Sequence, residues 1–127
     1  MSEQRRERGI AAYARIFDVP QETVAAVMEE QVGSVFADEA FTAAGGTAWG
    51  GQLLTDRDRA IAVLTALIAQ GVFDDRLSTY AALAGRQGLD LDALSELMVL
   101  LAGYLGYART SLAMHAIREA TPAQRLP

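Results

Sequence analysis

The chain has 127 residues, of which 51% are hydrophobic, and a formal net charge of −5. That length predicts a single domain spanning residues 1–127, and the negative charge argues against nucleic acid as a partner. The chain has no cysteine, which excludes disulfides, thiolate metal sites and cysteine nucleophiles. No apolar segment follows the N-terminal arginines at signal-peptide spacing, and no apolar run is long enough to span a membrane, so we expect a cytoplasmic protein.

The predicted elements are all helices, because the composition is rich in alanine and leucine and poor in proline. Apolar residues recur at helical spacing, and glycines, prolines and Asp90 mark the helix ends. The expected fold class is therefore all-α, a compact bundle of about six to seven helices. We place them at residues 3–17, 20–32, 35–44, 55–71, 74–87, 91–104 and 107–120, with Pro122 ending the last.

The stretch from Thr55 to Gly71 is expected to be the central helix, with Thr55 as its N-cap. Asp56 and Asp58 lie in the first turn, where the helix dipole favours anions, and Gly71 suits a left-handed stop. Between residues 60 and 69 only one residue is polar. A helix that is apolar on nearly every side is covered by neighbouring helices or by other subunits.

Four glycines surround the single tryptophan, Trp49, at positions 45, 46, 50 and 51. Glycine permits backbone conformations and close approaches that other residues do not. We therefore expect a loop here with close backbone contacts.

Three segments follow one another from residue 53 to residue 120: LLTDRDRAIAVLTALIAQG, a helix ending in RQGLD, and ALSELMVLLAGYLGYARTSLAMHAIREA. In this order they resemble the carboxymuconolactone decarboxylase family of the alkyl hydroperoxidase D-like superfamily. The likeness covers about residues 18–120. The residues that match the family's pattern are Leu54, Arg59, Gly71, Gly88, Tyr104 and Gly106, and Trp49 resembles a tryptophan placed just before this block.

The resemblance implies an all-helical, alkyl hydroperoxidase D-like fold that assembles as a homo-oligomer, a trimer or a hexamer. It also implies a small-molecule substrate and chemistry without a metal or organic cofactor. It implies no membrane partner.

The chain departs from the family at the catalytic positions. Counting back from Gly88, the family's catalytic histidine falls on Tyr80 and its catalytic glutamate on Arg76. The family's peroxidase branch uses a Cys-x-x-Cys pair, so thiol peroxidase activity is excluded here. Tyrosine is a better hydrogen-bond donor or acid than a base, and arginine cannot act as a base. We therefore expect chemistry that has diverged from the family's.

Arg76 and Tyr80 are one turn apart and share a helix face, next to Leu77, Leu83 and Ala84. In one interpretation they line a small apolar pocket, where the guanidinium holds a carboxylate or enolate oxygen and the phenol donates a second hydrogen bond. In the other interpretation, the Tyr80 ring packs in the core with its hydroxyl in water, and the Arg76 side chain extends to the surface.

The remaining candidates each have two interpretations. His115, the single histidine, is either a proton carrier or a surface residue. Arg59 either anchors a substrate or forms a structural ion pair with an acid such as Asp56 or Glu39. Three aromatic residues either form the walls of a substrate pocket or only pack: Trp49, Tyr104 and Tyr107.

Two functions are consistent with these features. The leading hypothesis is a cofactor-independent lyase or isomerase, decarboxylase-like or cyclase-like, that acts on a small metabolite bearing a carbonyl, lactone or carboxylate. Its catalytic residues would be Tyr80, Arg76 and His115. The rival is a non-catalytic oligomeric protein that binds a small molecule or a partner. No metal site is expected, because the histidine is alone and the acids are scattered.

Overall fold

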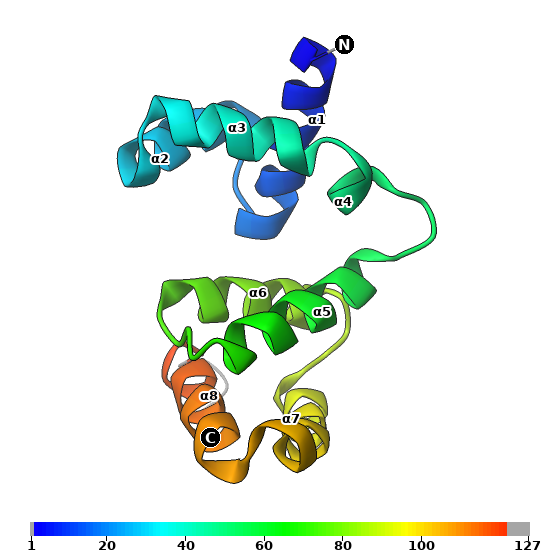
Figure 1. Cartoon of the computed structure of the whole chain (residues 1–127), viewed down its shortest axis with the longest axis vertical. Helices are drawn as coiled ribbons and strands as arrows, with labels where there is room; N and C mark the ends of the chain where they lie inside the picture. Colours follow the sequence, from blue (N-terminus) through cyan, green and yellow to red (C-terminus); the bar gives the residue numbers. More distant parts are fainter. Residues whose placement is uncertain (1, 122–127) are drawn as a thin grey trace. The chain divides into compact units, whose positions relative to one another are not determined.

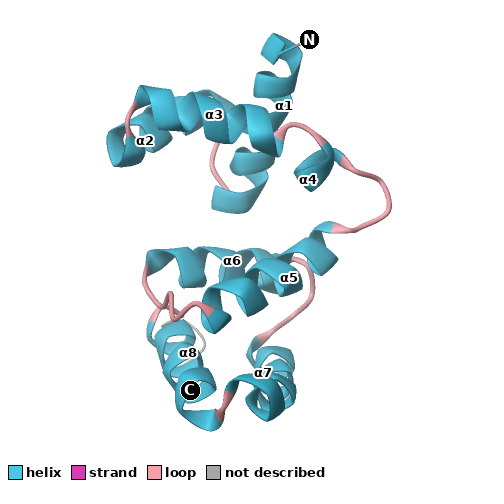
Figure 2. Ribbon diagram, viewed as in Figure 1, coloured by secondary structure: helices cyan, strands magenta, loops and turns pink. Residues whose placement is uncertain are grey.

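The computed structural model describes residues 2–121, which form eight α-helices and no strand (Figure 1, Figure 2). The all-α prediction is confirmed, and the expected helix end at Pro122 lies outside the described residues. The chain divides into two compact units, with the boundary between Thr55 and Asp56. Each unit has buried side chains of its own, and each is described by itself.

The first unit contains the four helices that precede the boundary. They are α1 (Ser2–Phe17), α2 (Gln21–Val32), α3 (Ser34–Ala44) and the short α4 (Thr47–Gly50). Asp18, with φ of 58°, turns the chain out of α1, and Gly33, with φ of 84°, separates α2 from α3. The expected loop around Trp49 is thus partly wrong, because four of its residues close a single helical turn in which Gly51 N–H donates to Thr47 O at 3.0 Å.

Helix α1 packs against α3 at backbone distance (Figure 1). Gly9 is buried, and a Cβ atom built on it would overlap the carbonyl oxygen of Phe41. A Cβ atom on Gly45 would likewise overlap the carbonyl oxygen of Arg5. The predicted close backbone contacts are therefore present, but they join α3 and its end to α1.

Arginines of α1 hold the C-terminal carbonyls of α3 and α4. Arg5 Nε donates to Thr42 O at 2.8 Å, and Arg8 Nε donates to Gly45 O at 3.1 Å. Arg15 Nη2 donates to Trp49 O at 3.3 Å. The last carbonyls of a helix lack partners within the helix and carry the negative end of its dipole, so these guanidinium groups satisfy and neutralise them.

The core of the first unit is a small cluster of α2 and α3 side chains. Its buried members are Val24, Met28, Ala37 and Phe41. Tyr13 of α1 packs on this cluster, with its ring centroid 5.7 Å from that of Phe41 in an edge-to-face arrangement. Burial raises the pKa of the Tyr13 phenol.

The second unit contains four helices of 12 to 15 residues. They are α5 (Asp56–Ala69), α6 (Asp75–Arg86), α7 (Leu91–Leu105) and α8 (Tyr107–Glu119). The predicted boundaries hold to within two residues, because turn chemistry sets them. Three glycines with positive φ, Gly71, Gly88 and Gly106, follow α5, α6 and α7. The Asp90 side chain caps α7 by accepting from Ala93 N–H at 2.9 Å.

Helix α5 packs side by side with α6 and also contacts α8 (Figure 1). One stripe of its apolar run is fully buried, consisting of Ala60, Leu64 and Ile68. Ala62 and Ala66 on the other side are exposed. Within the described residues of one chain, α5 is therefore covered on one side, and the expected cover by other subunits stays a prediction. None of the helices within residues 2–121 is long and apolar enough to cross a bilayer.

Candidate functional site

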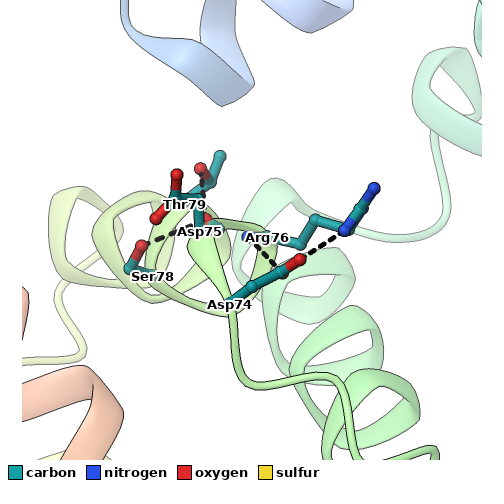
Figure 3. Close-up of polar contacts among 5 residues, drawn as sticks. All are labelled: Asp74, Asp75, Arg76, Ser78 and Thr79. Atoms are coloured by element: carbon teal, nitrogen blue, oxygen red, sulfur yellow. Dashed lines mark hydrogen bonds and ion pairs between the residues drawn. The ribbon is translucent and has the colours of Figure 1, made fainter. Parts of the chain in front are cut away.

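Arg76 lies in the first turn of α6, where an ion pair holds it. Asp74 is the N-cap of this helix, and its Oδ1 accepts from the Arg76 backbone N–H at 3.0 Å. The other oxygen, Oδ2, accepts from Arg76 Nη1 at 2.5 Å (Figure 3). The side chains of Arg76 and Asp74 are 67% and 56% exposed. Arg76 is therefore a surface cation whose charge is partly neutralised by its own helix cap.

Tyr80 follows one turn later and is half-buried. Its neighbours Leu77, Leu83 and Ala84 are fully buried. The face that Arg76 and Tyr80 share was expected to point inward, but Arg76, in the first turn, is exposed. Arg76 and Tyr80 together form a polar edge of α6, next to these buried apolar side chains. A guanidinium and a phenol are both hydrogen-bond donors to oxygen atoms, so this edge has donors of the kind that bind the anionic end of a small molecule.

The other candidates in the second unit do not gather around this edge as a closed pocket. His115 is exposed on α8. Tyr104 and Tyr107 flank the α7–α8 turn and are 82% and 73% exposed. Trp49 belongs to the first unit, where it is half-buried in α4.

Arg59 is the one charged side chain buried among the described residues. It is 7% exposed, and its Nη1 lies 3.3 Å from Oδ1 of Asp56, one turn earlier in α5. A buried guanidinium needs a nearby carboxylate because its desolvation is costly. The structural ion pair with Asp56, one of the two alternatives from the sequence, is therefore present.

A pocket that the sequence did not indicate lies on a different side of α6. It has a volume of about 330 Å³ and is bounded by α6, the loop to α7, the start of α7 and the end of α8. Its apolar walls are Ala81, Ala82, Leu89, Leu91, Leu94 and Ile117. Figure 3 shows Ser78, on the pocket side, leaving α6 in a different direction from Arg76.

One feature of the sequence could have indicated this pocket: small residues recur along one face of α6. Ser78, Ala82 and Gly85 follow the i, i+4, i+7 spacing of one helix face and leave room beside α6. Two charged residues, Arg86 and Asp90, also line the pocket. Such a site suits a small, mainly apolar ligand with few polar groups.

No group of three or more histidine or acidic side chains within residues 2–121 is arranged to hold a metal ion. Comparisons with protein-family models, curated proteins and solved structures found no match for this chain.

Proposed function

We propose that the chain is a cofactor-independent lyase or isomerase with an alkyl hydroperoxidase D-like fold. Its substrate is a small metabolite bearing a carbonyl, lactone or carboxylate, and it works as a homo-oligomer, a trimer or hexamer. The observation that carries the proposal is the edge of α6, where Arg76 and Tyr80 lie one turn apart beside buried Leu77 and Leu83.

The reaction we propose depends on stabilising negative charge. The Arg76 guanidinium binds a carboxylate or enolate oxygen, and the Tyr80 phenol donates a hydrogen bond to the charge that develops in the transition state. His115, the single histidine of the chain, is proposed as the proton carrier. All eleven basic residues of the chain are arginines, so a lysine Schiff base is not available to this chemistry.

The test is turnover of a panel of small lactone carboxylates and 3-oxo acids by Tyr80→Phe. This change removes one hydroxyl and leaves the half-buried ring in place, so the melting temperature should change little. Loss of a hydrogen bond to developing charge should lower kcat by about 10²-fold or more. Tyr13→Phe, in the core of the first unit, is the matched control. Equal turnover in Tyr80→Phe and wild type would remove Tyr80 from the site.

The pocket beside Ser78 and Gly85 favours a second candidate function, binding without turnover. Its walls are mainly apolar, and none of the proposed catalytic residues lines it. Gly85→Leu should fill the pocket and abolish binding of an uncharged apolar probe such as N-phenyl-1-naphthylamine, while Arg76→Ala leaves that binding unchanged. If Arg76→Ala abolished binding and Gly85→Leu did not, the ligand would bind at the edge of α6 instead.

A further inference from the structure

Helix α7 carries two apolar stripes. The inner stripe faces the core of the second unit and consists of Leu91, Leu94, Met98, Leu101 and Ala102, all buried. The outer stripe consists of Ala93, Leu97, Leu100 and Tyr104, at the i, i+4, i+7, i+11 spacing of a helix–helix seam. One helix therefore has the pattern to pack against neighbours on two sides.

The outer stripe is not covered by the rest of the second unit. Ala93 and Leu97 are half-buried, whereas Leu100 is 60% exposed and Tyr104 is 82% exposed. The apolar surface continues across the turn at Gly106 to Tyr107, which is 73% exposed. We call these five residues the outer face of α7.

The size of this face is of the kind that mediates association. Two tyrosines supply roughly 300 Å² or more of largely exposed surface. With Leu97 and Leu100 the outer face reaches on the order of 500 Å², a substantial part of the about 800 Å² that each partner contributes to a standard interface. Exposed apolar patches of several hundred Å² mark interaction sites on soluble proteins.

We propose that the outer face of α7 binds the same face of a second copy of this chain, with the two α7 helices antiparallel about a two-fold axis. This inference rests on the hexamer of the proposed function, in which two-fold axes relate two trimers, and names the contact surface on those axes. It does not depend on the catalytic part of that proposal.

The order of side-chain sizes along the stripe supports a second copy as the occupant. An antiparallel pairing centred between Leu97 and Leu100 sets these two leucines against each other across the axis. The same pairing sets the small Ala93 against the large Tyr104 at each end. A two-fold interface requires such self-complementarity, and alternating small with large residues fills the space between two helices.

The charges beside the stripe fit the same pairing. Asp92 and Glu96 are exposed along one flank in the N-terminal half of α7. In the antiparallel pair this acidic stretch faces the C-terminal half of the partner's same flank, which holds Val99 and Gly103 and no charge. No like charges are brought together, although the net charge of −5 on each chain opposes association at long range. Salt should therefore strengthen the contact.

The first test is the mass in solution of Leu100→Glu, measured by sedimentation and light scattering beside the wild type. Two introduced glutamate side chains would then lie beside the axis of each pair in place of apolar leucines, so the mass should fall to half of the wild-type value. Val35→Glu, at an 80% exposed position of the first unit, is the control with the same charge change and should keep the wild-type mass. A monomeric wild type, or an unchanged mass in Leu100→Glu, would overturn the proposal.

Orientation is tested by cysteine cross-linking, which is clean because the chain has no native cysteine. Ala93→Cys and Tyr104→Cys proteins, mixed and treated with a short bis-maleimide, should give a cross-linked dimer containing one chain of each. Cross-linking of Tyr104→Cys with itself, without mixed product, would indicate parallel helices and contradict the pairing.

The two proposals can fail separately. If Leu100→Glu halves the mass while the wild type turns over no substrate, the contact stands and the catalytic proposal fails. If the mass does not change but Tyr80-dependent turnover is found, the catalytic proposal stands and the contact proposal fails.

Discussion

Gly9 of α1 lies directly against the carbonyl group of Phe41 in α3, with no room for a side chain between the two backbones. A Cβ atom at Gly9 would come within 2.8 Å of Phe41 Cα and would overlap the carbonyl oxygen. We predict that Gly9→Ala forces α1 and α3 apart and destabilises the first unit by about 3 kcal/mol, because overpacking against backbone cannot be relieved by a rotamer change.

The control for this prediction is Gly85→Ala in α6. A Cβ atom at Gly85 meets no atom within 4 Å. Alanine is about 0.5–1 kcal/mol better than glycine in a helix interior, so this variant should be slightly more stable than the wild type. Denaturant unfolding followed by circular dichroism measures both. Equal stability of Gly9→Ala and wild type would show that α1 and α3 separate without cost.

Burial of Tyr13 predicts a loss of stability at alkaline pH. The pKa of its phenol is raised in the folded chain above the unfolded value of about 10, because burial disfavours the phenolate. The resulting stability is present below pH 10 and is lost as the pH rises from there through the folded pKa, since only the unfolded state then releases its proton. In Tyr13→Phe this part of the pH dependence should disappear, as seen in urea midpoints measured between pH 8 and pH 11. A Tyr104→Phe control should keep the wild-type slope.

The ion pair of Arg59 with Asp56 predicts a structural role for this arginine. Asp56→Ala leaves a guanidinium that is 8% exposed without this carboxylate, and should lower the free energy of unfolding by about 2 kcal/mol or more. Arg59→Met keeps the apolar stem and removes the charge, so it should cost less than Arg59→Ala. If Arg59 anchored a substrate, Arg59→Met would instead raise KM with little change in the melting temperature.

The cap of α6 gives a way to strengthen the proposed site. Asn caps a helix as well as Asp does, so Asp74→Asn should keep α6 intact while removing the charge that opposes Arg76. A carboxylate ligand should then bind more tightly, and Arg76→Ala should bind it more weakly. Titration with a lactone carboxylate measures both changes. Tighter binding in Asp74→Asn that persists in the Asp74→Asn, Arg76→Ala double variant would show that Arg76 is not the anion-binding group.

Much of the fold could be predicted because its signals are local. Asp90 before an apolar run predicts a cap, and glycines after such runs predict stops, whatever the rest of the chain does. The contact of Gly9 with Phe41 could not be predicted, because it joins residues 32 positions apart and a glycine within a helix has no local signature of a close crossing. What covers α5 could not be predicted for a related reason, since an apolar composition does not say which neighbours cover a helix.

The candidate site was less predictable than the fold. The shared face of Arg76 and Tyr80 follows from helical spacing, but the pairing of Arg76 with Asp74 depends on rotamers that spacing does not determine. The pocket beside Ser78 and Gly85 arises where the ends of three helices meet, and its small residues resemble ordinary packing positions in the sequence.

The segment from Gly51 to Thr55 joins the two units and lies outside every helix, and Leu53 within it is 98% exposed. A protease binds its substrate as an extended chain, and exposed loop segments take up that form more readily than residues inside a helix. Brief digestion with an enzyme that cleaves after leucine should therefore cut the chain first at this segment. The two fragments, each with a whole group of helices and its own buried side chains, should then outlast the intact chain in the digest.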